Sequence, residues 1–195
     1  MPIVGAGCDE SREPAHAADR RRWQAGPVHR LLLLRHAKSS WADPGVRDHD
    51  RPLNDRGRAA APLVGGYLRA HDLVPDRVLC SSARRTCETL ARLDLPDSVD
   101  IEVEHDLYLA YAETVLDLVR ETDDAVTTLM VVGHNPTTHD VALGLAGGGD
   151  PDALARLGQK YPTGALAVLG IPGAWRELAE GTATLDRFVT PRELA

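Results

Sequence analysis

Four consecutive leucines, Leu31 to Leu34, constrain the fold of this chain more than any other feature of its sequence. A strand with one face in solvent alternates apolar and polar residues, whereas an unbroken aliphatic run is typical of a strand that is covered on both faces. Such strands occur in parallel sheets with helices packed on each side. The run therefore predicts an α/β protein whose first strand lies near residue 31.

The rest of the chain alternates between short apolar runs and longer segments with helical periodicity. Further strands are expected at residues 78–80, 101–103, 129–132, 165–169 and 182–189. Helices are expected at residues 54–71, 83–93, 112–121 and 136–147. The glycines at 147–149 are interpreted as the end of the last helix and a flexible loop. This order predicts right-handed crossovers and a three-layer α/β fold, with a mainly parallel sheet and helices on both faces.

Length and composition favour one domain with a short extension. The chain has 195 residues, which is the usual size of a single domain. Residues 1–28 have no sustained periodicity and are interpreted as a flexible N-terminal extension, and residues 29–195 as the folded domain. No apolar run approaches the roughly 20 residues that cross a bilayer, and the first residues lack the apolar centre of a signal peptide. A cytoplasmic protein is expected.

Charge and cysteine content limit the classes of partner. The formal net charge of -7 argues against a general affinity for nucleic acid or an anionic membrane. Three sparsely placed cysteines fit a reducing compartment, and they do not have the spacing of metal ligands. The sequence does not indicate the oligomeric state.

Basic side chains follow three of the expected strands at the point where each strand ends. These residues are Arg35 and His36, then Arg84 and Arg85 after Ser81 and Ser82, and His134 followed by Asn135. Ligands of parallel α/β sheets bind at the carboxyl ends of the strands. Gathered there, guanidinium and imidazole groups suit a phosphate, whose oxygens pair with arginine nitrogens. A neutral histidine among them could attack phosphorus through a ring nitrogen, and this chemistry requires no metal or cofactor.

Four motifs in this order resemble the histidine phosphatase superfamily, and within it the SixA-like phosphohistidine phosphatases. They are LLLLRHAKSSW at 31–41, RPLNDRG at 51–57, CSSARRTCET at 80–89 and VVGHNP at 131–136. The resemblance spans about residues 29–170 and implies a phosphoglycerate mutase-like fold.

The resemblance also implies roles for four residues. His36 is the expected nucleophile that becomes phosphorylated, and Arg35, Arg85 and His134 are expected to bind the phosphoryl oxygens. Arg84 is then a surface residue. Ala37 stands where the superfamily most often has glycine, although alanine is known in the SixA-like branch.

A proton donor is harder to assign. Other members of the superfamily place an acid between the second arginine and the last histidine. The acidic residues in this interval of the chain are Glu102, Glu104, Asp106 and Glu113. Of these, Glu104 and Asp106 are the candidate proton donors. An alkoxide leaving group needs a proton, whereas imidazole leaves a protonated phosphohistidine as a neutral base. The predicted substrate is therefore phosphohistidine on a protein. The alternatives are a small phosphomonoester, or phosphate-dependent binding without turnover.

Several polar and aromatic residues near these motifs receive a structural interpretation. Ser81 and Ser82 are expected to satisfy backbone groups at the strand end, and the stretch Asp48 to Asp50 is expected to be a solvated loop. Trp41 could line the pocket entrance or anchor its loop. For Tyr108 the sequence likewise does not decide between a place at the pocket edge and a structural role.

Overall fold

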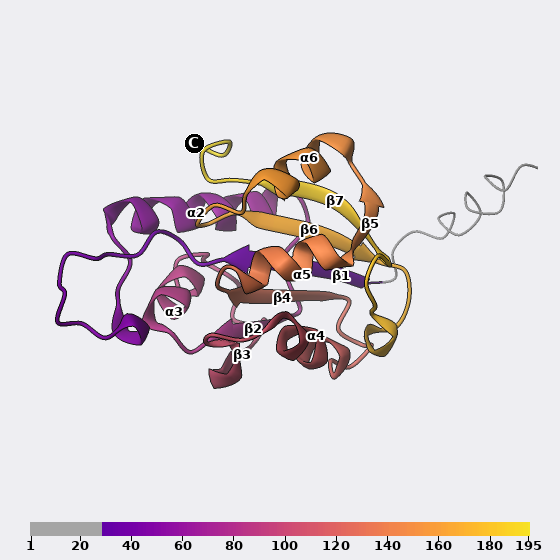
Figure 1. The fold of residues 1–195 in the computed structure, drawn as a ribbon, viewed down its shortest axis with the longest axis horizontal. Helices are drawn as coiled ribbons and strands as arrows, with labels where there is room; N and C mark the ends of the chain where they lie inside the picture. Colours follow the sequence, from indigo (N-terminus) through magenta and orange to yellow (C-terminus); the bar gives the residue numbers. More distant parts are fainter. Residues whose placement is uncertain (1–28) are drawn as a thin grey trace, which may run out of the picture.

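The central sheet has parallel pairs at both edges and two antiparallel pairings in its interior. The computed structural model describes residues 29–195, so the expected extension at 1–28 lies outside the described residues. Its strands are β1 (His29–Arg35), β2 (Arg77–Ser81), β3 (Asp100–Glu104), β4 (Thr128–Gly133), β5 (Ala146–Gly149), β6 (Leu166–Ile171) and β7 (Ala183–Val189). Their order in the sheet is β3-β2-β4-β1-β6-β7-β5 (Figure 1). Only β6 runs against its neighbours within this described sheet, which confirms the expected mainly parallel arrangement.

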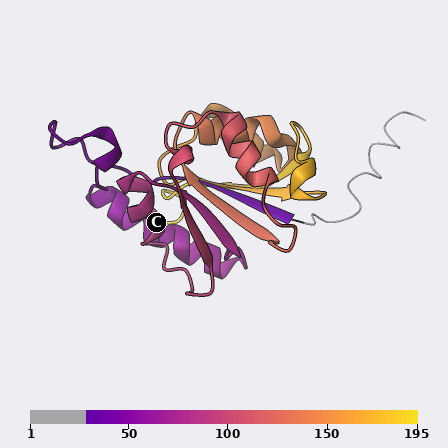
Figure 2. The same ribbon diagram turned by 90° about the horizontal axis from the view of Figure 1, so that it is seen from below.

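Helices cover both faces of the sheet, as Figure 2 shows. One layer holds α2 (Asp55–Ala70) and α3 (Arg84–Leu90), and the other holds α4 (Ala112–Arg120), α5 (Thr137–Leu145) and α6 (Pro151–Gln159). Short 3-10 helices occur at η2 (Asp48–Asp50), η3 (His105–Leu107) and η4 (Trp175–Glu177). The predicted three-layer α/β architecture is therefore confirmed.

The four leucines of β1 explain how one strand supports two cores. Leu31 and Leu33 pack into the cluster under α4, α5 and α6, whereas Leu32 and Leu34 pack into the cluster under α2 and α3. All four are at most 1% exposed. Each such burial contributes about 1.5–3 kcal/mol. The run thereby fixes β1 in the middle of the sheet, between β4 and β6.

The structure differs from the prediction after α5. The glycines at 147–149 belong to β5, an edge strand that pairs with β7, and the unpredicted helix α6 follows. A side chain on Gly147 would place its Cβ 1.9 Å from the carbonyl oxygen of Gly181. The glycines therefore permit close approach of two backbones, and the interpretation as a flexible loop was wrong.

The carboxyl ends of β1, β2 and β4 meet at one edge because these strands are parallel neighbours. In Figure 1 the arrow of β1 points to the left, toward the loop that carries η2. None of the helices in residues 29–195 has the length and apolar character of a membrane span. The polar residues that follow these strands form the candidate site.

Candidate functional site

The structure brings together the basic residues that follow three separate strands. The backbone N–H of His36 donates to the carbonyl oxygen of Gly133 across 3.0 Å, which joins the ends of β1 and β4. The rings of His36 and His134 have their centroids 5.2 Å apart. Both rings are buried, and so is Arg85 on α3. These side chains form a single cluster at the carboxyl edge of the sheet.

The hydrogen bond of His36 fixes which ring nitrogen is free. Its Nδ1 lies 2.7 Å from the carbonyl oxygen of Ala37. A carbonyl oxygen can only accept, so Nδ1 carries the proton and donates it. In the neutral ring, Nε2 then keeps its lone pair and can act as a nucleophile.

Burial and neighbouring cations keep both imidazoles neutral. Burial lowers the pKa of His36 to about 4, and the charges of Arg85 and Arg35 act in the same direction. Burial likewise lowers the pKa of His134 to about 3, with further contributions from His36 and Arg85. The pair is therefore uncharged at neutral pH.

An NMR titration of the ring nitrogens can check this state of His36. We expect the proton on Nδ1 at pH 7 and a midpoint near pH 4 for the folded protein, against ~6.5 in an unstructured peptide of the same sequence. Between these two pKa values the unfolded chain binds a proton that the folded chain does not. His36 therefore lowers the free energy of unfolding as the pH drops from 6.5 to 4. A charged imidazolium at pH 6 in the folded protein would contradict the account.

Arg35 is held at the end of β1 by the segment that precedes β6. Its Nη1 donates to the carbonyl oxygen of Tyr161 at 2.7 Å. The N–H of Gly164 donates to the carbonyl oxygens of both Arg35 and His36 at 3.0 Å. Burial lowers the pKa of Arg35, yet the guanidinium stays charged at neutral pH. Hydrogen bonds from neighbouring segments thus hold both His36 and Arg35 in place.

Arg85 is oriented by Asp48, a residue that the sequence analysis assigned to a solvated loop. Arg85 donates from Nη1 to the Asp48 carbonyl oxygen at 2.7 Å and from Nη2 to the carboxylate at 3.1 Å. Arg51 and Tyr108 donate to the same carboxylate at 2.7 and 3.0 Å. Partial burial acts to raise the pKa of Asp48, but hydrogen bonds from Arg51 and Tyr108 outweigh it and the pKa is lowered. Asp48 is therefore exposed, as the solvated-loop interpretation expected, but it also contributes an ionised carboxylate to the site, which that interpretation did not include.

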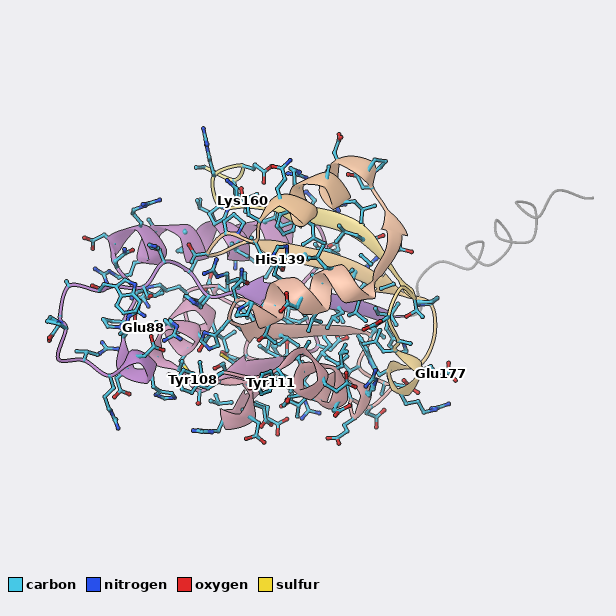
Figure 3. All side chains as sticks on the ribbon, in the orientation of Figure 1. Glu88, Tyr108, Tyr111, His139, Lys160 and Glu177 are labelled. Carbon is cyan, nitrogen blue, oxygen red and sulfur yellow. The ribbon has the colours of Figure 1, made fainter. Side chains whose placement is uncertain are left out.

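The two adjacent arginines of α3 lie in different surroundings. Arg85 is 5% exposed. Arg84 is exposed and pairs with Glu88 at 2.7 Å. The other carboxylate oxygen of Glu88 accepts from the N–H of Leu53 at 2.9 Å and so ties α3 to the loop before α2. Figure 3 shows Glu88 and Tyr108 on the side toward which β1 points.

Ser81 contacts a catalytic candidate and not the backbone groups that sequence reasoning assigned to it. Its Oγ lies 2.8 Å from Nε2 of His134. When this hydroxyl donates, the neutral imidazole of His134 carries its proton on Nδ1 and can donate it to an anion. Ser82 forms its hydrogen bond with a different histidine, since its Oγ lies 3.0 Å from Nε2 of His49.

Replacing Ser81 with alanine should change the tautomer of His134 and slow turnover. We expect kcat to fall about tenfold, less than the ~100-fold that follows loss of a direct oxyanion donor. NMR of the ring nitrogens should show the proton moving from Nδ1 toward Nε2. Ser82→Ala is the matched control and should leave both quantities unchanged. An unaltered tautomer in Ser81→Ala would show that Ser81 only fills space.

The two predicted proton donors lie on β3 and η3. Glu104 bonds with Glu102, and this contact raises the pKa of Glu104. Asp106 is exposed in η3. Among the hydrogen bonds and ion pairs of residues 29–195, neither carboxylate contacts His36, His134, Arg35 or Arg85. Asp48 is the carboxylate that does.

Of the two aromatic residues that the sequence analysis left undecided, only Tyr108 contacts the candidate site. Tyr108 lies edge-on to His134, with ring centroids 5.8 Å apart. Trp41 is 73% exposed and stacks on the Arg51 guanidinium, whose Cζ lies 3.2 Å from the ring centroid. Trp41 therefore covers Arg51, and Tyr108 contacts the site directly.

Two nitrogens of the site are buried without a hydrogen-bond partner among the described residues, Nε of Arg35 and Nδ1 of His134. Buried donors are normally paired. Nε of Arg35 is a donor, and Nδ1 of His134 is one in the tautomer in which Ser81 donates to Nε2, so the oxygens of a bound anion would satisfy both. No group of three His, Cys, Asp or Glu side chains in residues 29–195 has the arrangement of a metal site.

Comparisons with known proteins agree with this geometry. A model of the histidine phosphatase superfamily (branch 1) matches residues 31–108. An uncharacterized protein of Mycobacterium tuberculosis is 44% identical over 163 residues, which cover 82% of this chain and 100% of that protein.

Two solved structures are similar over almost their whole length. A protein assigned as the phosphohistidine phosphatase SixA of Nakamurella multipartitia has a TM-score of 0.75 at 34% identity, covering 85% of this chain and 98% of that one. A protein assigned as SixA in Agrobacterium tumefaciens has a TM-score of 0.71 at 35% identity, covering 86% and 100%. The expected phosphoglycerate mutase-like fold is thereby confirmed.

Proposed function

Because this chain belongs to the histidine phosphatase superfamily and is SixA-like, we propose that it removes phosphoryl groups from phosphohistidine on proteins through His36. The superfamily and the SixA-like structures support phosphatase activity. The substrate and the roles of the residues are the proposal. The observation that carries it is the His36 ring, whose Nδ1 is held by Ala37 and whose Nε2 is left free beside two arginines.

The reaction has two displacements. In the first, Nε2 of His36 attacks phosphorus and the bond from phosphorus to the substrate nitrogen breaks. The substrate imidazole, which already carries a proton on its other ring nitrogen, leaves as a neutral base. In the second, water attacks phosphorus, the bond to Nε2 breaks, and orthophosphate and a proton are released. Arg35, Arg85 and Nδ1 of His134 stabilise the charge on the phosphoryl oxygens in both steps.

The state of Asp48 favours a nitrogen leaving group. Asp48 is the carboxylate in contact with Arg85, and its lowered pKa leaves it without a proton to donate at neutral pH. A substrate whose leaving group needs no proton suits this arrangement. Hydrolysis of small phosphomonoesters is the second candidate, and the raised pKa of Glu104 is the observation in its favour.

A comparison of matched substrates tests the proposal. We would measure kcat/KM for a phosphohistidine peptide, the same peptide with phosphoserine, and a sugar phosphate, each with and without a chelator. We expect the phosphohistidine peptide to be preferred by about 100-fold, the usual contribution of a general acid that the ester would need, with no effect of the chelator. Equal or reversed preference would favour the ester. Binding without phosphate release would indicate a module without turnover.

A further inference from the structure

A groove of about 700 Å³ opens beside the site on the side of α2 and the carboxyl terminus. Five cationic side chains line it, together with the carboxylate of Glu193: Lys38, Arg56, Arg156, Lys160 and Arg192. The only two lysines of the chain are among them. This concentration of positive charge contrasts with the net charge of -7 of the whole chain.

Four of the five cations are free of carboxylate partners within residues 29–195. Arg156 forms an ion pair with Glu193. Lys38, Arg56, Lys160 and Arg192 are exposed, and none of them pairs with an acid in this part of the chain. Uncompensated cations on one surface attract an anionic ligand. The lining of the groove therefore carries a net positive charge that its own carboxylate does not neutralise.

The groove is continuous with the residues that hold the nucleophile. Lys38 lies two positions after His36. Lys160 precedes Tyr161, whose carbonyl oxygen accepts from Arg35. Thr163, also in the lining, precedes the glycine whose N–H bonds to the ends of Arg35 and His36. The lining of the groove therefore includes direct sequence neighbours of the residues that hold Arg35 and His36 in place.

We propose that this groove binds an acidic segment next to the phosphorylated histidine of a protein substrate. The inference rests on the proposed function and names the chemistry of its substrate. Between the cations lie small and apolar side chains, Ala59, Ala60, Leu63 and Pro162, which suit a polypeptide backbone. A long nucleic acid is disfavoured because the net charge of -7 repels it outside the groove.

Charge reversal in the groove tests the proposal. The double variant Lys160→Glu/Arg192→Glu changes two residues that line the groove, are exposed, and make no hydrogen bond or ion pair with the site residues. Arg176→Glu, on η4 at the other end of the molecule, is the matched control; Figure 3 marks this end by Glu177 and the groove side by Lys160. Two phosphohistidine peptides of equal length are compared, one flanked by glutamates and one by serines.

We expect the wild-type protein and Arg176→Glu to prefer the acidic peptide by about tenfold in kcat/KM at low salt, and the double variant to lose this preference. The preference should also shrink as salt screens the charges. If the double variant kept the wild-type ratio, or if the wild type showed no preference, the proposal would be overturned.

A second measurement separates this inference from the phosphatase assignment. Binding of fluorescein-labelled deca-glutamate, followed by anisotropy, needs no phosphoryl group. Binding that is lost in the double variant and kept in Arg176→Glu supports the groove even if no phosphohistidine is hydrolysed. No binding to the wild type, or tighter binding of an RNA of equal charge that the double variant also loses, would overturn the proposal.

Discussion

His36→Ala is expected to abolish turnover, with kcat falling ~10⁴-fold or more, as for other enzymes that lose a covalent nucleophile. The other imidazole of the site cannot replace it in the same way, because Nε2 of His134 is engaged with Ser81. The substitution should not unfold the protein, since the His36 side chain bonds only to the adjacent carbonyl of Ala37 among the described residues. The measurement is kcat on the phosphohistidine peptide, with circular dichroism to verify the fold.

An exposed histidine serves as the control for His36. His71 lies at the end of α2 and bonds to the carbonyl oxygen of Tyr67, so His71→Ala should keep wild-type turnover. Retention by His36→Ala of more than about a hundredth of the wild-type kcat would be incompatible with covalent catalysis by this residue.

Arg85→Ala is expected to reduce kcat/KM by about 10²–10³-fold, because it removes donors to oxygens whose charge is stabilised in the transition state. The adjacent Arg84 provides an unusually close control. Arg84→Ala removes the same side chain one position away but breaks only an exposed ion pair with Glu88, which costs about 0–1 kcal/mol of stability.

Lysine at position 85 distinguishes charge from geometry. Arg85→Lys keeps the positive charge but loses the planar fork that bonds to Asp48 at two points, so we expect it to recover only part of the lost activity. Equal effects of the alanine substitutions at 84 and 85 would mean that α3 supplies no specific phosphoryl ligand.

The sequence allowed prediction of those features that depend on pattern and order. The aliphatic run at 31–34 predicted the central strand, and the residues after three strands predicted which basic groups would meet, because parallel neighbours end at one edge. Only the family resemblance predicted that Arg85 belongs to the site and that Arg84 lies on the surface. Helical periodicity alone does not show which of two adjacent arginines faces inward.

The features that were missed depend on contacts between distant segments. Asp48 reaches Arg85 across 37 residues, and Ser81 reaches His134 across 53; neither pairing leaves a local pattern. The strand β5 was missed because its glycines serve close backbone approach to a segment more than 30 residues later. Helix α6 did leave a signal, since Asp150 caps it through the N–H of Ala153 and Pro151 occupies its first turn.

Identification of the phosphorylated residue tests the central claim most directly. The full chain would be mixed briefly with a phosphohistidine peptide that carries labelled phosphate, quenched in alkali, digested and analysed by mass spectrometry. We predict label on His36, stable in alkali and lost in acid, and none in His36→Ala. Label on any other residue, or turnover at full rate with no labelled protein at any time, would contradict the account.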